Sequence, residues 1–178
     1  MAGQGRTASR YAQSMSQSGE TSFQLRAATL DDADQIAHIW HRAWHDGHVG
    51  HVPAALHAHR DLDSFRARVP TRIAATTIAA SGARVVGFVT VHDDEVEQIF
   101  VAASARGSGA AAALLDHAEA IIARRFAVAW LAVVAGNARA RRFYERRGWR
   151  DASAIDYAAE ITGGTISVPS RRYEKQLG

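Results

Sequence analysis

Residues 99–115, IFVAASARGSGAAAALL, constrain the fold of this chain more than any other stretch. A short apolar strand runs through Arg106-Gly107-Ser108-Gly109 into a helix rich in alanine and leucine. At such a joint several backbone N–H groups have no helical partner, and the positive end of the helix dipole points outward. The two glycines let a ligand's oxygens approach the backbone closely. The joint therefore suits a phosphate group, although the same pattern also serves as a plain connection.

The composition favours one soluble domain. A chain of 178 residues can bury a substantial core, and its 47% hydrophobic and 22% charged residues are ordinary for a globular protein. No apolar run approaches the roughly 20 residues that span a bilayer, so we expect no membrane association. The polar residues 1–21 indicate a disordered leader or a cloning remnant, and residues 22–178 form the expected domain.

Cysteine and lysine usage excludes several kinds of site. The chain has no cysteine, which rules out disulfides, thiolate metal sites and a cysteine nucleophile, and which fits a cytoplasmic protein. Lys175 is the sole lysine, and the net charge is only +3. The arginines between residues 139 and 150 form a local cluster, which favours an anionic ligand or a solvated helix face over nucleic acid.

Hydrophobic periodicity predicts alternating strands and helices. Strands are expected at residues 23–27, 73–79, 84–92, 95–101, 127–134, 154–161 and 166–173, and helices at about 29–43, 54–59, 62–69, 107–126 and 138–147. This order predicts an α/β (α+β) fold in which a mixed, mostly antiparallel sheet of about seven strands carries helices on both faces. Ligands of such sheets bind at the carboxyl ends of strands, where the glycine joint lies.

Two motifs flank the predicted helix at 107–126 and the strand that follows it. The first, Arg106-Gly107-Ser108-Gly109-Ala110-Ala111, fits the pattern Q/R-x-x-G-x-G/A; the second begins at Asn137 and ends in Phe143-Tyr144-Glu-Arg-Arg-Gly148-Trp149. Together they resemble the GCN5-related N-acetyltransferase superfamily over about residues 23–177. The chain lacks the proline that often precedes the Arg-Gly pair, and it has Trp149 where phenylalanine is usual.

The resemblance implies direct transfer of an acetyl group from acetyl-CoA to a primary amine, with a small molecule preferred as the acceptor. A backbone N–H at Phe100 or Val101 would meet the acetyl carbonyl, and Asn137 would bond the pantetheine arm or its neighbouring backbone. Residues implied to hold the CoA phosphates are Arg106, Gly107, Ser108, Gly109, Ala110, Ala111 and, unless it faces solvent, Arg142. A homodimer is implied too. A non-catalytic acyl-CoA sensor and acetylation of a protein amine stay open as alternatives.

The resemblance also assigns an acid and a base. Tyr144 matches the general acid, because a phenol of pKa near 10 can protonate a thiolate of pKa near 8.5; the alternative is a core aromatic. Glu97 is the candidate base, with Glu95 in reserve, and solvated side chains are the alternative. Alternation along the strand puts Glu95, Glu97 and Ile99 on one face.

In the resembling family, the first two helices and their connection form the acceptor wall. Trp44, His45 and His48 are therefore candidate substrate-binding residues, together with Glu95, and the acidic residues near the expected mouth favour a cationic acceptor. His41 and His45 have the spacing of a zinc-binding pair, but no His-Glu-x-x-His motif is present. We therefore expect no metal site.

Overall fold

A computed structural model describes residues 23–178, so the leader predicted for residues 1–21 lies outside the described residues. The strands are β1 (Gln24–Ala27), β2 (Thr76–Ser81), β3 (Arg84–His92), β4 (Glu95–Val101), β5 (Val128–Val134), β6 (Arg150–Ile161) and β7 (Gly164–Gln176). The helices are α1 (Ala33–His48), α2 (Ala54–His57), α3 (Leu62–Arg72), α4 (Ala110–Ile122) and α5 (Ala138–Arg146). None of these helices is long and apolar enough to cross a membrane.

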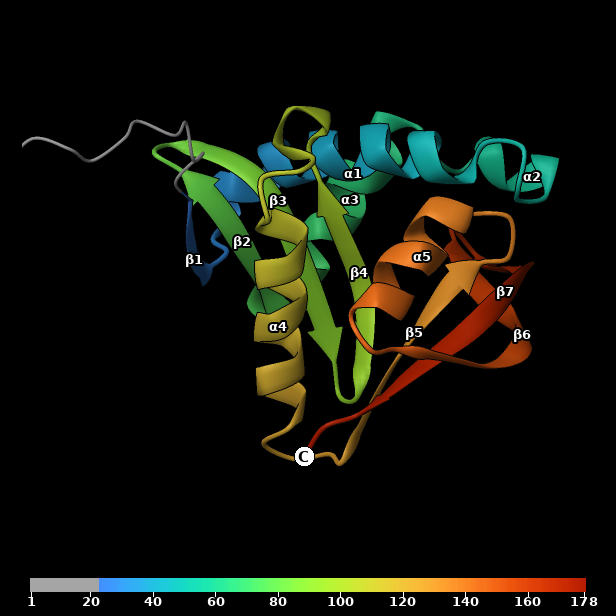
Figure 1. The fold of residues 1–178 in the computed structure, drawn as a ribbon. Helices are drawn as coiled ribbons and strands as arrows, with labels where there is room; N and C mark the ends of the chain where they lie inside the picture. The colour runs from blue at the N-terminus through green and yellow to red at the C-terminus, as the bar shows by residue number, and fades with distance from the viewer. Residues whose placement is uncertain (1–22) are drawn as a thin grey trace, which may run out of the picture.

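The seven strands form one sheet in the order β1-β2-β3-β4-β5-β7-β6, which confirms the predicted fold class. All neighbouring strands pair in antiparallel fashion except β4 and β5, which are parallel and share only the pair Glu95–Trp130. Beyond that pair the two strands diverge, as Figure 1 shows. The sheet is therefore split near its middle, and the backbone edges of β4 and β5 are available to a ligand.

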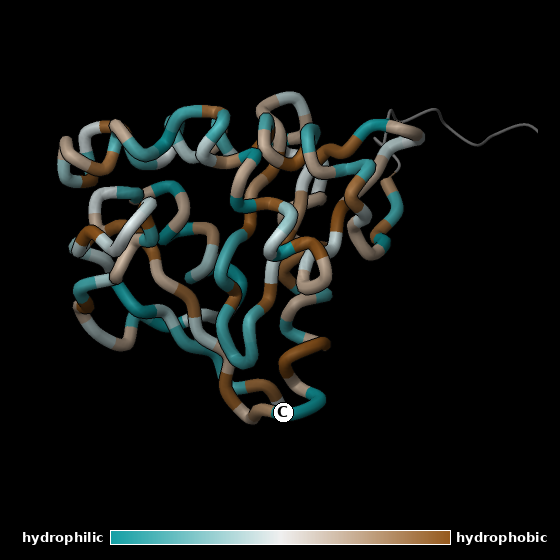
Figure 2. Tube along the Cα trace, turned by 180° about the vertical axis from the view of Figure 1, so that it is seen from behind, coloured by the Kyte–Doolittle hydropathy of each residue, from teal (hydrophilic) through white to brown (hydrophobic). Residues whose placement is uncertain are grey.

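Helices cover both faces of the sheet. On one face α4 buries Leu114, Leu115 and Ile122 against the strands. On the other face α1 and α3 bury Trp40 and Phe65, whose ring centroids lie 5.1 Å apart. Hydrophobic segments gather where the central strands meet α4, whereas the turn between β3 and β4 is hydrophilic (Figure 2).

Several element boundaries differ from those predicted from periodicity. Helix α1 continues to His48 and does not end near residue 43, because Trp44 and Gly47 are buried on the same helical face as its earlier apolar residues. At its other end, Asp32 accepts hydrogen bonds from Thr29 and two from the guanidinium of Arg26, which lower the pKa of this carboxyl to about 2.

A β-bulge in β4 changes the side of the sheet that each side chain faces. The pairing register with β3 skips one residue, Glu97. Val96 and Ile99 pack on the α4 side, whereas Phe100 packs on the α1 side. The expectation that Glu95, Glu97 and Ile99 share a face is therefore wrong for Ile99, because the bulge shifts the alternation by one position.

Candidate functional site

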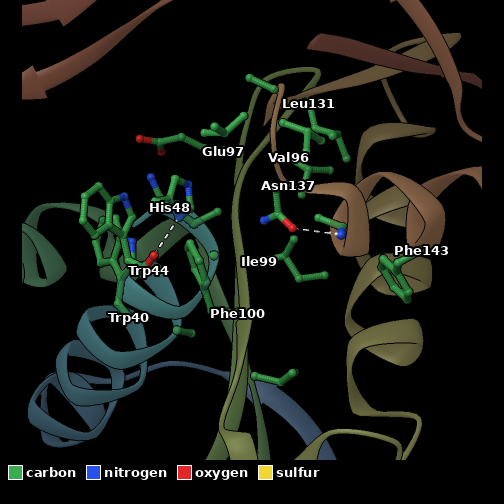
Figure 3. A pocket seen from close by; sticks show the side chains of 18 of the residues that line it. Trp40, Trp44, His48, Val96, Glu97, Ile99, Phe100, Leu131, Asn137 and Phe143 are labelled. Atoms are coloured by element: carbon green, nitrogen blue, oxygen red, sulfur yellow. Dashed lines mark hydrogen bonds between the residues drawn. The ribbon is translucent and has the colours of Figure 1, made fainter. Parts of the chain in front are cut away.

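A cavity of about 660 Å³ lies where β4 and β5 diverge. Figure 3 shows β4 running through its centre, with two different walls. On one side Trp40, Trp44, His48, Glu97 and Phe100 face the space from α1 and β4; on the other side stand Val96, Ile99, Leu131, Asn137 and Phe143. We call these the aromatic wall and the α5 wall. The cavity thus opens through the sheet and offers two chemically distinct sides.

The glycine joint lies at the mouth of the cavity, where Gly107, Gly109 and Ala111 line it. Gly107 has φ 81° and Gly109, the N-cap of α4, has φ 85°, values that side chains rarely permit. Within residues 23–178 no group accepts a hydrogen bond from the backbone N–H of Gly107, Gly109, Ala111 or Ala112. Four free donors at a helix N-terminus form a fitting cradle for a pyrophosphate.

The other residues of the joint have structural partners. The Ser108 hydroxyl donates to the carbonyl of Ala105 at 2.7 Å, and Ala110 is buried; neither lines the cavity. The guanidinium of Arg106 lines the cavity and forms an ion pair with Asp46 at the end of α1. This pair ties the joint to the helix that carries the aromatic wall.

Along β4, the backbone N–H groups of alternate residues point toward β3 and toward the gap between β4 and β5. The N–H of Ala102 donates to Val86 in β3 at 2.8 Å, so the N–H of Val101, one residue earlier, points the other way, toward the gap. The same alternation turns the N–H of Phe100 toward β3, while its ring packs against Trp40 at 6.4 Å. Of the two predicted donors, Val101 is thus the one that faces the cavity.

Helix α5 and its N-cap carry three residues singled out in the sequence. Asn137 is the N-cap of α5: its Oδ1 accepts from the N–H of Ala140 at 3.1 Å, which matches the predicted contact with neighbouring backbone. Tyr144 lines the cavity, is 8% exposed, and packs against Phe143 and Trp149; burial raises the pKa of its phenol. Arg142 is exposed and does not line the cavity, whereas Arg139 and Arg146 do.

Glu97 stands at the bulge and is part of the aromatic wall. Its Oε1 accepts a hydrogen bond from Nε of Arg72 at 3.0 Å, and only 19% of its side chain is exposed. The same guanidinium donates to Glu160 of β6 at 2.5 Å. The candidate base is therefore held in place by a cation, which the sequence pattern did not reveal.

Glu95 lies outside the cavity lining but is bonded to a residue within it. The hydroxyl of Tyr157 in β6 donates to its Oε1 at 3.1 Å, and Tyr157 lines the cavity. Burial raises the pKa of the Glu95 carboxyl, so this group is more basic than an ordinary glutamate. Tyr157 is a second phenol that sequence reasoning missed, because nothing marks its position in a 12-residue strand.

The histidines of α1 have separate environments. His48 lines the cavity and stacks on Trp44 with 4.9 Å between ring centroids. Its Nδ1 donates to the carbonyl of Trp44 at 2.8 Å, and burial lowers its pKa to about 4, so the ring is neutral at pH 7. His45 bonds the carbonyl of Arg60 at 3.0 Å and does not line the cavity. Within residues 23–178 no three His, Asp or Glu side chains are placed to hold a metal ion.

Three arginines that the sequence analysis did not single out also line the cavity. Arg60, Arg68 and Arg72, which we call the arginine cluster, come from the segment before α3 and from α3 itself. Arg68 and Arg72, four residues apart, lie on one side of α3, a signal that was present in the sequence, whereas Arg60 precedes the helix. The acidic groups expected to attract a cationic acceptor are instead engaged: Glu97 with Arg72, and Asp46 with Arg106.

The fold is shared with solved structures of other proteins. Solved structures with the same architecture include a GCN5-related N-acetyltransferase of Rhodopseudomonas palustris (TM-score 0.68, 21% identity, 87% of this chain and 96% of that one). PaiA N-acetyltransferase of Thermoplasma acidophilum, in complex with coenzyme A, has a TM-score of 0.63 at 14% identity over 87% and 99% of the two chains. YncA of Salmonella typhimurium, with acetyl-CoA, has a TM-score of 0.64 at 18% identity, and the match covers 88% of this chain and 95% of that one.

These likenesses establish the class of protein: the chain has the GCN5-related N-acetyltransferase fold. The sequence model of the Acetyltransferase (GNAT) family matches residues 33–149, more than half of the chain. The protein therefore belongs to the Acetyltransferase (GNAT) family, and the predicted resemblance is confirmed. None of the curated proteins matches it in sequence.

Proposed function

We propose that this protein is an acetyl-CoA-dependent N-acetyltransferase that acts on the primary amine of a small molecule. The observation that carries the proposal is the cradle of four free N–H groups at the mouth of a cavity that passes through the split sheet. It suits the pyrophosphate of CoA. The pantetheine arm would then run along the α5 wall and leave the aromatic wall to the amine.

The transfer needs a polarised carbonyl, a neutral amine and a proton for the departing sulfur. The N–H of Val101 faces the gap and would bond the acetyl oxygen, which stabilises the negative charge that develops there. The amine nitrogen attacks the carbonyl carbon, the new C–N bond forms, and the C–S bond breaks. The nitrogen gives up one proton, and the sulfur takes one as it leaves.

Glu97 is the proposed acceptor of the amine proton, directly or through water. It is fixed at the bulge on the acceptor side by Arg72. The Glu95–Tyr157 pair is the reserve, because the Glu95 carboxyl is made more basic by burial and its phenol partner reaches the cavity. Tyr144, whose burial keeps its phenol protonated, is the proposed donor to sulfur on the α5 wall.

A small acceptor is favoured over a protein because the acceptor side is crossed by hydrogen bonds. The guanidinium of Arg60 donates to the carbonyl of Glu160 at 2.9 Å, and Arg72 pairs with the carboxylate of the same residue. These bonds connect α3 and the segment before it to β6 across the aromatic wall. A polypeptide acceptor would have to displace them.

The test follows CoA release from acetyl-CoA with a panel of primary amines. We expect Tyr144→Phe and Glu97→Gln to lower kcat about a hundredfold, the usual contribution of one acid or base, while CoA affinity stays unchanged. Tyr173→Phe, which removes a phenol that does not line the cavity, is the control and should keep most of the activity.

Two results would contradict the proposal. If the wild type binds acetyl-CoA but transfers to no amine, the protein is an acyl-CoA sensor. If both variants keep full activity, the catalytic assignment is wrong although transfer itself stands.

A further inference from the structure

Arg60 and Arg68 have no part in the proposed transfer, in which Arg72 only holds Glu97 in place, yet the arginine cluster borders the acceptor's position. The guanidinium of Arg60 lies 5.7 Å from the ring centre of Trp44, and that of Arg72 lies 5.9 Å from the ring centre of Trp40. Arg72 also contacts Glu97. The cluster is therefore on the aromatic side of β4, with the candidate base.

Two members of the cluster have no carboxylate partner among residues 23–178. Arg60 is 5% exposed and donates to the backbone carbonyls of His59 and Glu160 at 3.0 and 2.9 Å. Arg68 donates to the carbonyl of His59 at 3.3 Å. Carbonyls occupy some of the N–H groups but do not neutralise the charge, and burial lowers the pKa of Arg60 to about 10.

The charges that line this side of the cavity are unequal. Three guanidinium groups face two carboxylates, Glu97 and Glu160, and both carboxylates are bonded to Arg72. Asp61, the next carboxylate, is exposed and accepts from the N–H of Ser64 to cap α3. A buried charge without a counter-ion is costly, so an anion that enters between Arg60 and Arg68 gains free energy.

The phosphates of CoA do not explain this cluster. Their cradle is the N-terminus of α4, which packs on the face of the sheet opposite to α1 and α3. The arginines are instead bonded to β6 through Glu160. The excess positive charge therefore belongs to the acceptor side.

We infer that the acceptor carries a carboxylate beside its amine and is an α-amino acid with an apolar side chain; this inference rests on the proposed function. Because Arg72 bonds Glu97 at 3.0 Å, an amine placed at Glu97 has the cluster as its immediate neighbour. The forked guanidinium matches a planar carboxylate, and the rings of Trp40, Trp44 and Phe100 suit an apolar side chain.

Gln98 supplies an independent polar contact on this side. It lines the cavity next to Glu97, and its Oε1 is buried without a hydrogen-bond partner in the described chain. A buried acceptor of this kind is costly unless a ligand satisfies it. The ammonium or amine N–H of the substrate is the donor that the proposed pose brings to it.

The experiment compares matched acceptors. L-leucine, L-methionine and L-phenylalanine are each assayed against the amine that lacks the carboxylate: 3-methylbutylamine, 3-(methylthio)propylamine and 2-phenylethylamine. We expect kcat/KM for at least one amino acid to exceed that of its amine tenfold to a hundredfold, as for one charge-assisted hydrogen bond. The phosphonate analogue of the best amino acid is assayed as well, and it should be the poorer acceptor.

Arg68→Gln tests the cluster, and Arg66→Gln is the matched control. Both residues are on α3 and both changes remove one positive charge, but Arg66 is exposed and bonded to Asp34 and Asp63 away from the cavity. Arg68→Gln should raise the KM of the amino acid about tenfold or more, without effect on the matched amine or on CoA affinity. Arg66→Gln should change neither.

Several results would overturn the inference and leave the proposed function intact. These are equal use of amino acids and their amines, a preference for the phosphonate, or weaker CoA binding by Arg68→Gln. If no amine is acetylated although acetyl-CoA binds, the proposed function fails. Calorimetry with L-leucine, L-methionine and L-phenylalanine in the presence of CoA then tests the inferred anion site separately. If an amino acid binds and Arg68→Gln weakens that binding, the anion site is supported. If none of them binds, the anion site is contradicted.

Discussion

The two sides of the cavity are built from different parts of the chain. The donor side consists of backbone groups: free N–H groups at the start of α4, the edge of β4, and an asparagine that caps α5. All of these come from one continuous stretch, residues 95–144. The acceptor side consists of side chains from α1, from α3 and the segment before it, from β4 and from β6, which meet only in the fold.

This difference explains why the residues of the donor side could be predicted from the sequence and most of those on the acceptor side could not. Backbone donors require particular local residues, such as glycines at positive φ, so a common donor leaves a local motif. A wall of side chains requires only that suitable residues lie close together in the fold, and these residues can come from any part of the sequence. The acceptor can therefore differ between relatives that share a donor cradle, and it has to be inferred from each chain's own contacts.

The largest expected effect comes from blocking the backbone cradle. Gly109→Val adds a side chain at φ 85° where the free N–H groups converge, and it should weaken CoA binding about tenfold to a hundredfold for each phosphate bond lost. Gly82→Val is the control, because Gly82 has φ 60° in the turn between β2 and β3, away from the cavity. Calorimetric titration with CoA measures both. Equal, small losses would show that the donor side does not depend on this backbone.

A second prediction concerns the acceptor side and pH. Burial holds the folded-state pKa of His48 at about 4, below its ordinary value, so the unfolded chain binds the proton more readily. Wild-type stability should therefore fall by about 2–3 kcal/mol relative to His48→Asn as pH drops from about 6.5 to 4. Urea unfolding at several pH values measures this difference.

The control for that measurement is Val49→Ala, at the exposed residue that follows His48, because this change adds and removes no titratable group. The stability of the wild type relative to this variant should stay the same over that pH range. If His48→Asn also shows no pH-dependent difference, the imidazole is more solvated than its place on the aromatic wall indicates.

The smallest effect is expected where the two sides touch. Asn137 caps α5, and its Nδ2 lies so close to Gly47 of α1 that a Cβ there would come within 3.0 Å. Asn137→Ala should destabilise the protein by about 1 kcal/mol in thermal unfolding, whereas Asn137→Asp keeps the capping oxygen and should not. Equal CoA affinity in both variants and the wild type would restrict Asn137 to capping.

Most of the fold could be predicted from the sequence because its elements have clear periodicity. The seven strands and the two-faced helix arrangement follow from it, and the strands β3 and β4 have the predicted ends. The extension of α1 to His48 did not follow. Histidine and glycine are weak helix formers, and packing of Trp44 and Gly47 against the rest of the protein decides their conformation.

The sequence by itself determined the family and indicated the proposed donor cradle, because glycines at positive φ and an asparagine that caps α5 with its side chain act within their own short segments. Only the tertiary structure decided what surrounds the acceptor. The bulge at Glu97 turns Ile99 to the α4 side of the sheet, and Arg72 pairs with Glu97. Tyr157 of β6 donates a hydrogen bond to Glu95. These contacts join residues that are up to 62 positions apart, and no local pattern records such distances.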